Sequence, residues 1–308
     1  MRVCFFYLVK ITCRLFSKIA KSTSMKFLNS LSNILMKSFL NISYTHNIKV
    51  AQSFNKVRYD NKIWVCWFQG IENAPTIVLA SIKSIEKNKP NNFEVIILTD
   101  SNYKEYVDLP DYILKKYDLG LITKAQFSDI LRVNLLYHHG GFWIDSTVYM
   151  MKRIDSKIIE SNDFITLCDD KDNNSIGISQ GRWTGYFMYS KRDSQEFEFL
   201  VCLFNNYWKS EDKLINYFLI DYAISLTYDK FPEFRRKVHM GGLDGANKFL
   251  MDKLLQSRDV SALQINSLIN DRTGIFKLSH KNFYNKNKVY VDLIEEIDCV
   301  NNQNSCDL

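Results

Sequence analysis

Hydrophobic positions along the chain follow two spacings, and each spacing predicts a different kind of element. Apolar runs of strand length cover residues 62–68 and 93–98. Residues 75–87 lie between these runs and have the character of a helix. A strand, a helix and a second strand of this combined length form a parallel βαβ unit. The pattern therefore predicts an α/β fold.

The segment 123–138 predicts a second, longer helix, with apolar residues recurring every four positions. Thr123 can cap its first turn, and Gln126 stands three residues further on, as in a capping box. The pair Gly140-Gly141 gives the backbone the freedom to end the helix and turn. Residues 142–144 are short and wholly apolar, so they predict a buried strand directly after that turn.

The rest of the chain predicts short strands followed by a helical C-terminal half. Strand-like runs cover 164–168 and 186–189, and helical patterns cover 194–208, 212–229 and 245–256. No unit of 20–50 residues repeats, which excludes a solenoid. The chain of 308 residues has only four prolines and no obvious linker. We expect one α/β domain over residues 60–308, with a mostly parallel, Rossmann-like sheet, preceded by an extension over residues 1–59.

Charge distinguishes that extension from the rest of the chain. Residues 1–59 contain ten Lys or Arg and no Asp or Glu, so this segment carries +10 while the whole chain carries +6. Its longest uncharged apolar run, residues 3–9, is far shorter than the roughly 20 residues of a membrane-spanning helix. Basic and apolar residues alternate over residues 8–21, which predicts an amphipathic helix on an anionic membrane surface.

Three other interpretations of residues 1–59 remain. A basic tail without a fixed partner is the simplest of them. A nucleic-acid partner is not expected, because the segment has no recognisable reader motif. A cleaved signal peptide is disfavoured, since no small-residue cleavage site follows an apolar core. The seven cysteines are scattered without a Cys-x-x-Cys pair, which favours a reducing cytoplasm over disulfides or a zinc site.

Candidate chemistry gathers around the 123–138 helix and the strand that follows it. Asp129 and Arg132 lie three residues apart on the helix, so they share one face. Asp145 follows the short strand, and open α/β sheets bind their ligands at the carboxyl ends of strands. Each feature has an ordinary explanation: an exposed helix ion pair worth about 0.3–0.5 kcal/mol, or a turn-capping aspartate. Together they predict a site.

These residues also carry a family resemblance. Ser128–Arg132 has the form Ser-Asp-x-x-Arg, and Gly140–Thr147 has the form Gly-Gly-x-Trp-x-Asp-x-Thr. Both resemble the capsular polysaccharide synthesis proteins, relatives of the DXD sugar transferases of glycosyltransferase family 32 and of the clostridial glucosylating toxins. Similar blocks recur from about residue 60 to about 282. The resemblance implies a GT-A fold and transfer of a sugar, with retained configuration, from a nucleotide-sugar, by default a UDP-sugar.

The resemblance also assigns roles to individual residues. It implies donor contacts from Trp67, Asp129, Arg132, Trp143, Asp145 and Lys277, and an acceptor-side role for Asp221 beside the catalytic Asp145 and Arg132. On residues alone, Trp67 could equally be a core tryptophan and Asp221 a solvating helix residue. The implied acceptor is a growing surface or capsular saccharide, which a basic extension would suit if it is lipid-linked. This places the protein in the cytoplasm, peripheral on the inner face of the membrane.

A divalent cation is the remaining implication. Asp145 matches the first carboxylate of the DXD motif, but Thr147 stands where full motifs have a second carboxylate. A hydroxyl is a weaker, neutral ligand, which His280 could compensate as a nitrogen ligand that favours Mn²⁺ over Mg²⁺. His280 could also be an ordinary loop histidine. Two alternatives to an enzyme remain open: a non-catalytic nucleotide-sugar binder, which Thr147 favours, and a membrane-surface interaction protein that acts through residues 1–59.

Overall fold

The computed structural model describes residues 2–23, 26–50, 61–169 and 177–295. Its helices are α1 Arg2–Thr23, α2 Lys26–Tyr44, α3 Thr76–Asn88, α4 Asp111–Asp118, α5 Lys124–His138, α6 Ser156–Ser161, α7 Gln195–Ser210, α8 Leu219–Lys230, α9 Pro232–Met240, α10 Leu250–Gln256, α11 Ala262–Ile269 and α12 Lys288–Tyr290. Its strands are β1 Lys62–Cys66, β2 Glu94–Leu98, β3 Gly141–Ile144, β4 Val148–Met150, β5 Phe164–Cys168, β6 Phe187–Ser190, β7 Gly242–Asp244 and β8 Ile275–Lys277.

A six-stranded sheet in the order β2-β1-β3-β6-β5-β7 forms the centre of the molecule. Strand β1 pairs in parallel with β2 and with β3, and β5 pairs in parallel with β7. Strand β6 runs antiparallel to both of its neighbours, β3 and β5. The predicted α/β class and mostly parallel central sheet are therefore confirmed. Strands β4 and β8 form a separate two-stranded antiparallel sheet.

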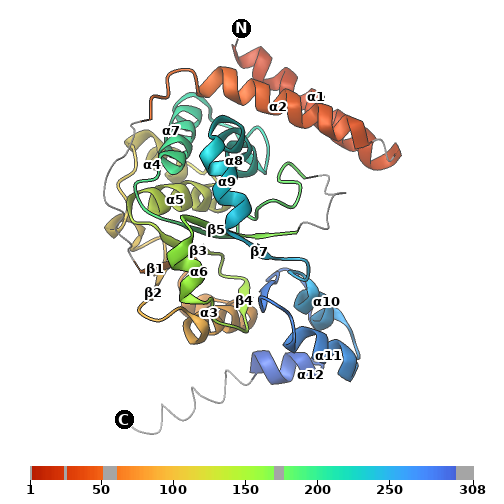
Figure 1. Ribbon diagram of the computed structural model, residues 1–308. Coiled ribbons are helices and arrows are strands. Elements are labelled where there is room, and N and C mark those ends of the chain that lie inside the picture. Colours follow the sequence, from red (N-terminus) through yellow and green to blue (C-terminus); the bar gives the residue numbers. More distant parts are fainter. Residues whose placement is uncertain (1, 24–25, 51–60, 170–176, 296–308) are drawn as a thin grey trace.

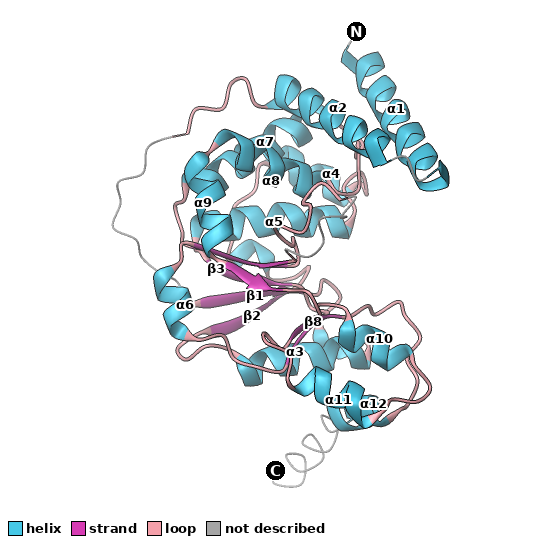
Figure 2. Ribbon diagram, turned by 45° about the vertical axis from the view of Figure 1, so that its right-hand side comes forward, coloured by secondary structure: helices cyan, strands magenta, loops and turns pink. Residues whose placement is uncertain are grey.

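The two faces of the sheet pack against different sets of helices (Figures 1 and 2). Successive strand side chains point to opposite faces. Trp64 and Trp143 belong to the core shared with α5, α7, α8 and α9. Their neighbours Ile63 and Phe142 belong to the other core, which includes residues of α3, α10 and β8. Strands that are buried on both faces explain the continuous apolar runs of the sequence.

Helix α5 begins and ends where its sequence indicates. The Thr123 side chain accepts a hydrogen bond from the Gln126 backbone N–H, and the Gln126 side-chain oxygen accepts one from the Thr123 backbone N–H, which completes the capping box. After the helix, Gly140 has a φ of +70°, and a Cβ there would lie 2.7 Å from the Arg192 backbone nitrogen. Only glycine fits this position without strain or collision. The turn directs β3 into the sheet beside β1.

The N-terminal segment forms two helices instead of a single one, and these helices pack against the rest of the molecule. Phe6 and Val9 of α1 and Leu40 of α2 belong to the same core as residues of α5, α7, α8 and α9. Polar contacts add to this packing: the Tyr222 hydroxyl donates to Asn33 Oδ1 at 2.7 Å, and Lys37 forms an ion pair with Asp229. Figure 2 shows α2 lying over α7 and α8, with α1 on the outer side of α2. Of the predicted extension 1–59, residues 1, 24–25 and 51–59 lie outside the described residues.

Two helices of the C-terminal half begin later than the sequence predicted. The pattern at 212–229 predicted one helix, but α8 begins only at Leu219. The Tyr207 hydroxyl bonds to the Lys213 carbonyl and the Ile215 amide, which holds this stretch in a loop. The predicted helix 245–256 is likewise shortened to α10, because the Gly245 amide donates to the Cys168 carbonyl and continues the pairing of β7 with β5.

Candidate functional site

A pocket of about 550 Å³ opens at the carboxyl ends of β1 and β3. Its wall includes Trp67 after β1, Ser128 on α5, and Asp145 and Thr147 after β3. Lys277 also lines the pocket, although it lies on β8, far later in the sequence than β1 and β3. Parallel strands place their carboxyl ends at one edge of a sheet, which is where open α/β sheets bind ligands. Six predicted residues thus line the pocket at the expected edge: Trp67, Trp143, Asp145, Thr147, Lys277 and His280. The other three, Asp129, Arg132 and Asp221, are not among its lining residues.

Asp145 lies at the centre of the polar contacts in this pocket. Its Oδ1 accepts from the indole Nε1 of Trp143 at 2.9 Å and from Nη2 of Arg132 at 3.3 Å. Its Oδ2 accepts from Nζ of Lys277 at 2.9 Å. Burial by itself would raise the pKa of Asp145, but the charges of Lys277 and Arg132 outweigh burial, so the pKa is lowered. Asp145 is therefore an anion held between two cations.

Arg132 is a buried arginine with carboxylates on two sides. Its side chain is 6% exposed, and Nη2 lies 3.3 Å from both Asp129 Oδ1 and Asp145 Oδ1. Its guanidinium stacks over the Trp143 ring with 4.9 Å to the centroid. Because Asp129 is only 14% exposed, this is a buried ion pair and not the exposed one that the sequence allowed. A buried guanidinium is also a strong binder of phosphate and carboxylate oxygens.

Asp129 and a further carboxylate, that of Asp221, interact electrostatically with Arg132. Burial raises the pKa of Asp129 to about 7, with a further upward contribution from Asp145 and Asp221. Burial also raises the pKa of Asp221 on α8, whose Oδ1 accepts from Trp183 Nε1 at 3.1 Å. The structure therefore brings Asp129 and Asp221 into one charge cluster with Arg132. Asp221 is buried in this cluster, unlike an aspartate that only solvates the surface of a helix.

Lys277 reaches the site through the small sheet, which the sequence did not reveal. Strand β8 pairs with β4 in a register that sets Lys277 opposite Val148. The lysine ammonium contacts Asp145 Oδ2 at 2.9 Å and Thr147 Oγ1 at 2.6 Å. A backbone hydrogen bond of 2.8 Å from the Leu278 amide to the Thr147 carbonyl continues the pairing. The strand pairing thus holds the lysine against the Asp-x-Thr turn.

The tryptophans of the opening strand separate into core and pocket. Trp64 is fully buried and donates to the Gly140 carbonyl at 3.0 Å, so it is a core residue, the role that the sequence favoured for it. Trp67 lines the pocket, and among the described residues its buried indole Nε1 has no hydrogen-bond partner. Cys66 and Tyr186 border the same site, and sequence reasoning missed both for this role; burial raises the pKa of each side chain.

Comparison with known proteins supplies the family. The profile of the capsular polysaccharide synthesis proteins matches residues 14–294. The chain belongs to this family. The match extends beyond the 60–282 expected from the sequence blocks and includes α2 and the C-terminal part of α1 from residue 14.

Among solved structures, a "PaToxG Glycosyltransferase" is similar at 14% identity and a TM-score of 0.38, over 70% of this chain and 82% of that one. A search of curated proteins gives no match.

In this capsular polysaccharide synthesis protein, the three residues predicted to hold a divalent cation make other contacts. Of the three predicted ligands, Asp145 and Thr147 both direct their oxygens at the Lys277 ammonium. The third, His280, packs edge-on against Trp67 with 5.4 Å between ring centroids. Burial lowers the pKa of His280, and the charges of Lys281 and Lys277 lower it further. No cluster of three His, Cys, Asp or Glu suited to a metal exists within the described ranges.

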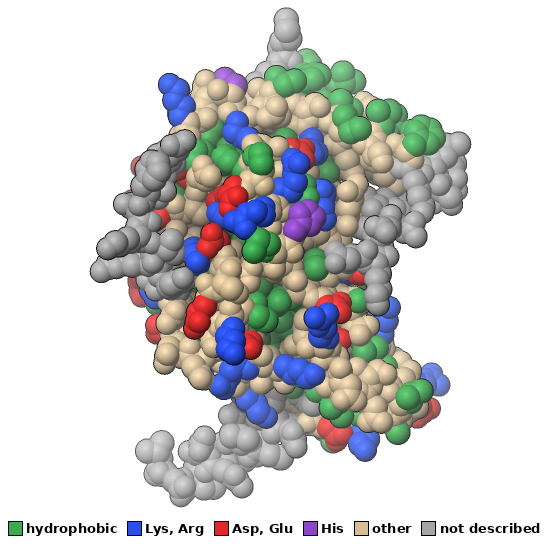
Figure 3. Space-filling model, in the orientation of Figure 1, with side chains coloured by type: hydrophobic (Ala, Val, Ile, Leu, Met, Phe, Trp, Pro, Cys, Tyr) green, Lys and Arg blue, Asp and Glu red, His purple; other side chains and the backbone are tan. Residues whose placement is uncertain are grey.

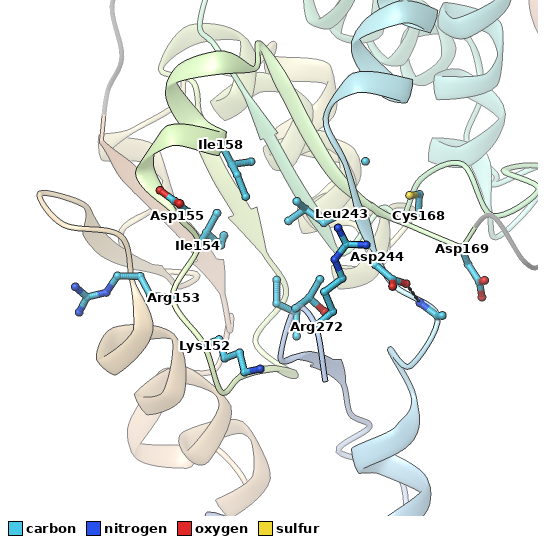
Figure 4. Close-up of a pocket in the computed structure, with 14 residues that line it drawn as sticks. Lys152, Arg153, Ile154, Asp155, Ile158, Cys168, Asp169, Leu243, Asp244 and Arg272 are labelled. Atoms are coloured by element: carbon cyan, nitrogen blue, oxygen red, sulfur yellow. Dashed lines mark hydrogen bonds between the residues drawn. The ribbon is translucent and has the colours of Figure 1, made fainter. Parts of the chain in front are cut away.

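A second cavity of about 460 Å³ lies at the carboxyl ends of β5 and β7 (Figure 4). Lys152, Arg153 and Arg272 line it together with Asp155 and Asp244. Figure 4 shows that these residues come from separate segments of the chain and that Arg153 points away from Arg272 and Asp244. The sequence did not single out this cavity, because its residues are far apart in the chain and form no motif.

Proposed function

We propose that this protein is a GT-A-like glycosyltransferase that moves a sugar from a nucleotide-sugar donor to a saccharide acceptor in the synthesis of a capsular or surface polysaccharide. One observation carries the proposal: Arg132 and Lys277 converge on Asp145 in a pocket at the carboxyl ends of parallel strands, with Trp67 on its wall. Membership of the capsular polysaccharide synthesis family supports it. By the same family resemblance, the donor is a UDP-sugar.

The donor's parts match the chemistry of the pocket. Trp67 has an aromatic face on the pocket wall, where a nucleotide base can stack. Lys277 and Arg132 are the cations for the two phosphates. Asp129 and Asp145 have carboxylate oxygens suited to the hydroxyls of the sugar or ribose, and Trp143 orients Asp145 through its indole N–H.

The reaction breaks the bond between the anomeric carbon and the diphosphate oxygen and forms a bond to the acceptor hydroxyl oxygen. The acceptor hydroxyl loses its proton, and the nucleoside diphosphate departs with increased negative charge. Cations fixed in advance near that charge stabilise the transition state more than the ground state. Arg132 and Lys277 serve this role, with retained anomeric configuration as in related families. Asp221 is the acceptor-side candidate, on the other side of Arg132.

The N-terminal helices are proposed to bind an anionic membrane surface, where a lipid-linked acceptor would be found. Among described residues, large apolar side chains are exposed along both helices: Phe5, Leu8, Ile11, Leu15, Ile19, Phe27, Leu31, Ile34 and Ile42. Figure 3 shows hydrophobic side chains gathered over this part of the molecule. Arg14 and Lys18 are exposed on the same helix as Leu15. No helix in the described ranges is long and apolar enough to cross a membrane.

The second candidate is a protein that binds a nucleotide-sugar without turning it over. Thr147 favours this function, because it replaces a carboxylate of the full DXD motif. Release of UDP from a UDP-sugar, or transfer of the sugar, separates an enzyme from such a binder.

The test is the thermal stability of the full chain against UDP-glucose, UDP-galactose and UDP-N-acetylglucosamine, each with EDTA and with Mn²⁺. A donor at 100 times its Kd should add about 2.7 kcal/mol to the free energy of unfolding. Asp145→Ala should abolish the stabilisation, because it removes the carboxylate that positions Arg132 and Lys277. Asp108→Ala, at an exposed aspartate outside the pocket, is the matched control and should keep it. Absence of stabilisation by any donor in a folded protein would contradict the proposal.

A further inference from the structure

We infer that the Lys277 ammonium replaces the divalent cation of DXD-type sugar transferases, so that this protein binds a nucleoside diphosphate without a metal ion. The inference rests on the proposed function and deepens it. Lys277 Nζ lies 2.9 Å from Asp145 Oδ2 and 2.6 Å from Thr147 Oγ1. These are the two oxygens that the motif would offer to a metal.

The net charge of the motif is the same with Lys277 as with a divalent cation. A motif with two carboxylates carries −2, which a divalent cation neutralises. Here Asp145 is the one carboxylate of the motif, Thr147 is neutral, and the ammonium of Lys277 supplies a single positive charge. The loss of a carboxylate at Thr147 and the presence of Lys277 are therefore two parts of one substitution. A divalent ion placed between the same oxygens would stand in repulsive contact with the ammonium.

The backbone holds the ammonium in this position. Strand β8 pairs with β4, and Val148 next to Thr147 stands opposite Lys277 in the register. The Lys277 amide donates to the Lys248 carbonyl at 2.6 Å, and the Leu278 amide to the Thr147 carbonyl at 2.8 Å. Both ends of the contact are thus fixed by main-chain hydrogen bonds, as a substitute for a metal must be to stabilise charge without reorganisation.

Lys277 also retains the means to bind the ligand. An ammonium has three N–H donors, and the described contacts of Lys277 with side-chain oxygens use two of them. The lysine lines the pocket and its side chain is 21% exposed. The third N–H is available for an oxygen of a diphosphate in the pocket. Arg132, the second cation on Asp145, adds a further positive charge to the same site.

The experiment measures binding of UDP, and of inorganic pyrophosphate as a probe without a base, by calorimetry on the full chain. We expect equal affinity with EDTA and with Mn²⁺, within about twofold. Lys277→Met should weaken binding in EDTA by about tenfold or more, because a charge-assisted hydrogen bond is lost. Lys87→Met, at an exposed lysine on α3, is the matched control and should bind as the wild type does.

A second arm rebuilds the metal motif. The double variant Thr147→Asp with Lys277→Met offers two carboxylates and no ammonium, so it should bind Mn²⁺ directly in electron paramagnetic resonance and regain UDP binding only with Mn²⁺. The wild type should show no bound Mn²⁺. A wild type that binds UDP only with Mn²⁺, or a Lys277→Met variant that binds as tightly as wild type, overturns the inference and leaves the proposed function standing. Failure to bind any probe under either condition overturns the proposed function itself.

Discussion

Asp145 shows how this site stabilises a buried charge. A carboxylate taken out of water is costly unless hydrogen bonds and opposite charges replace its hydration. Here Trp143, Arg132 and Lys277 together supply donors to both oxygens. The result is an anion on the pocket wall with two cationic partners, of which Lys277 also lines the pocket. The same pairing that stabilises Asp145 therefore orients the groups that would receive a diphosphate.

The first residue-scale prediction concerns Asp129, whose pKa burial raises to about 7. An unfolded aspartate titrates near pKa ~3.9, so the folded state holds this proton more tightly. Its contribution to stability is full below about pH 4 and is lost as the pH rises to about 7. The side chain of the Asp129→Asn variant stays neutral. As the pH rises from about 4 to about 7, the melting temperature of this variant should therefore increase relative to that of the wild type. Parallel pH profiles for the two proteins would contradict the raised pKa; Asp108→Asn serves as the control.

The second residue-scale prediction compares two glycines with the same backbone angle. Gly140 and Gly120 both have a φ of +70°, but a Cβ at Gly120 meets nothing within 4 Å, while one at Gly140 meets the Arg192 amide at 2.7 Å. Gly120→Ala should cost about 1–2 kcal/mol from backbone strain alone. Gly140→Ala should cost a further 1–3 kcal/mol or so from the collision. Urea unfolding measures both, and equal losses would show that the close approach is unimportant.

At the scale of elements, the sequence pattern predicted the helices and the longer strands but not the pairing of the shortest strands. The capping box of α5 and the apolar pattern of β1 are local properties. Strands β4 and β8 have three residues each and are separated by more than 120 residues in the chain. Three residues are too few for a period to be recognised. This pairing nevertheless places Lys277 in the pocket.

The element-scale prediction concerns α2, which packs on the body. Leu40 is fully buried in the shared core, whereas Ile42 two residues later is 69% exposed. Leu40→Ala should lower the free energy of unfolding of the whole chain by about 2–5 kcal/mol. Ile42→Ala, the matched control, should change it by less than about 0.5 kcal/mol. If Leu40→Ala leaves the main unfolding transition unchanged, α2 is an independent extension and not part of the core.

At the scale of the whole molecule, the sheet brings together residues that the sequence scatters. Asp145 follows β3, Trp67 follows β1, and Asp221 lies on α8, more than 70 residues beyond the strand. The parallel alignment of β1 with β3 sets the first two at one edge. The α8 helix then adds Asp221 to the charge cluster around Arg132.

The molecule-scale prediction concerns membrane binding by the exposed apolar residues of α1. The full chain should co-sediment with vesicles that contain phosphatidylglycerol, and less with neutral phosphatidylcholine vesicles, because each basic residue near an anionic surface contributes about 1 kcal/mol. A triple variant with Leu8, Ile11 and Leu15 changed to Ser should lose most of this binding. Serine at Leu119, Leu263 and Ile269, also exposed, is the control. Equal binding by the two triple variants would refute a membrane role for α1.

The sequence by itself determined the α/β class, the capping of α5, the βαβ unit and the motif residues Asp129, Arg132 and Asp145, because these depend on local periodicity and spacing. It did not reveal the loop before α8, because the bonds of the Tyr207 side chain to the Lys213 carbonyl and the Ile215 amide leave no periodic pattern in the sequence. Nor could it decide what faces Thr147. Only the tertiary structure brings Lys277 to that hydroxyl, since a contact between residues 130 positions apart follows from strand pairing and not from any local pattern.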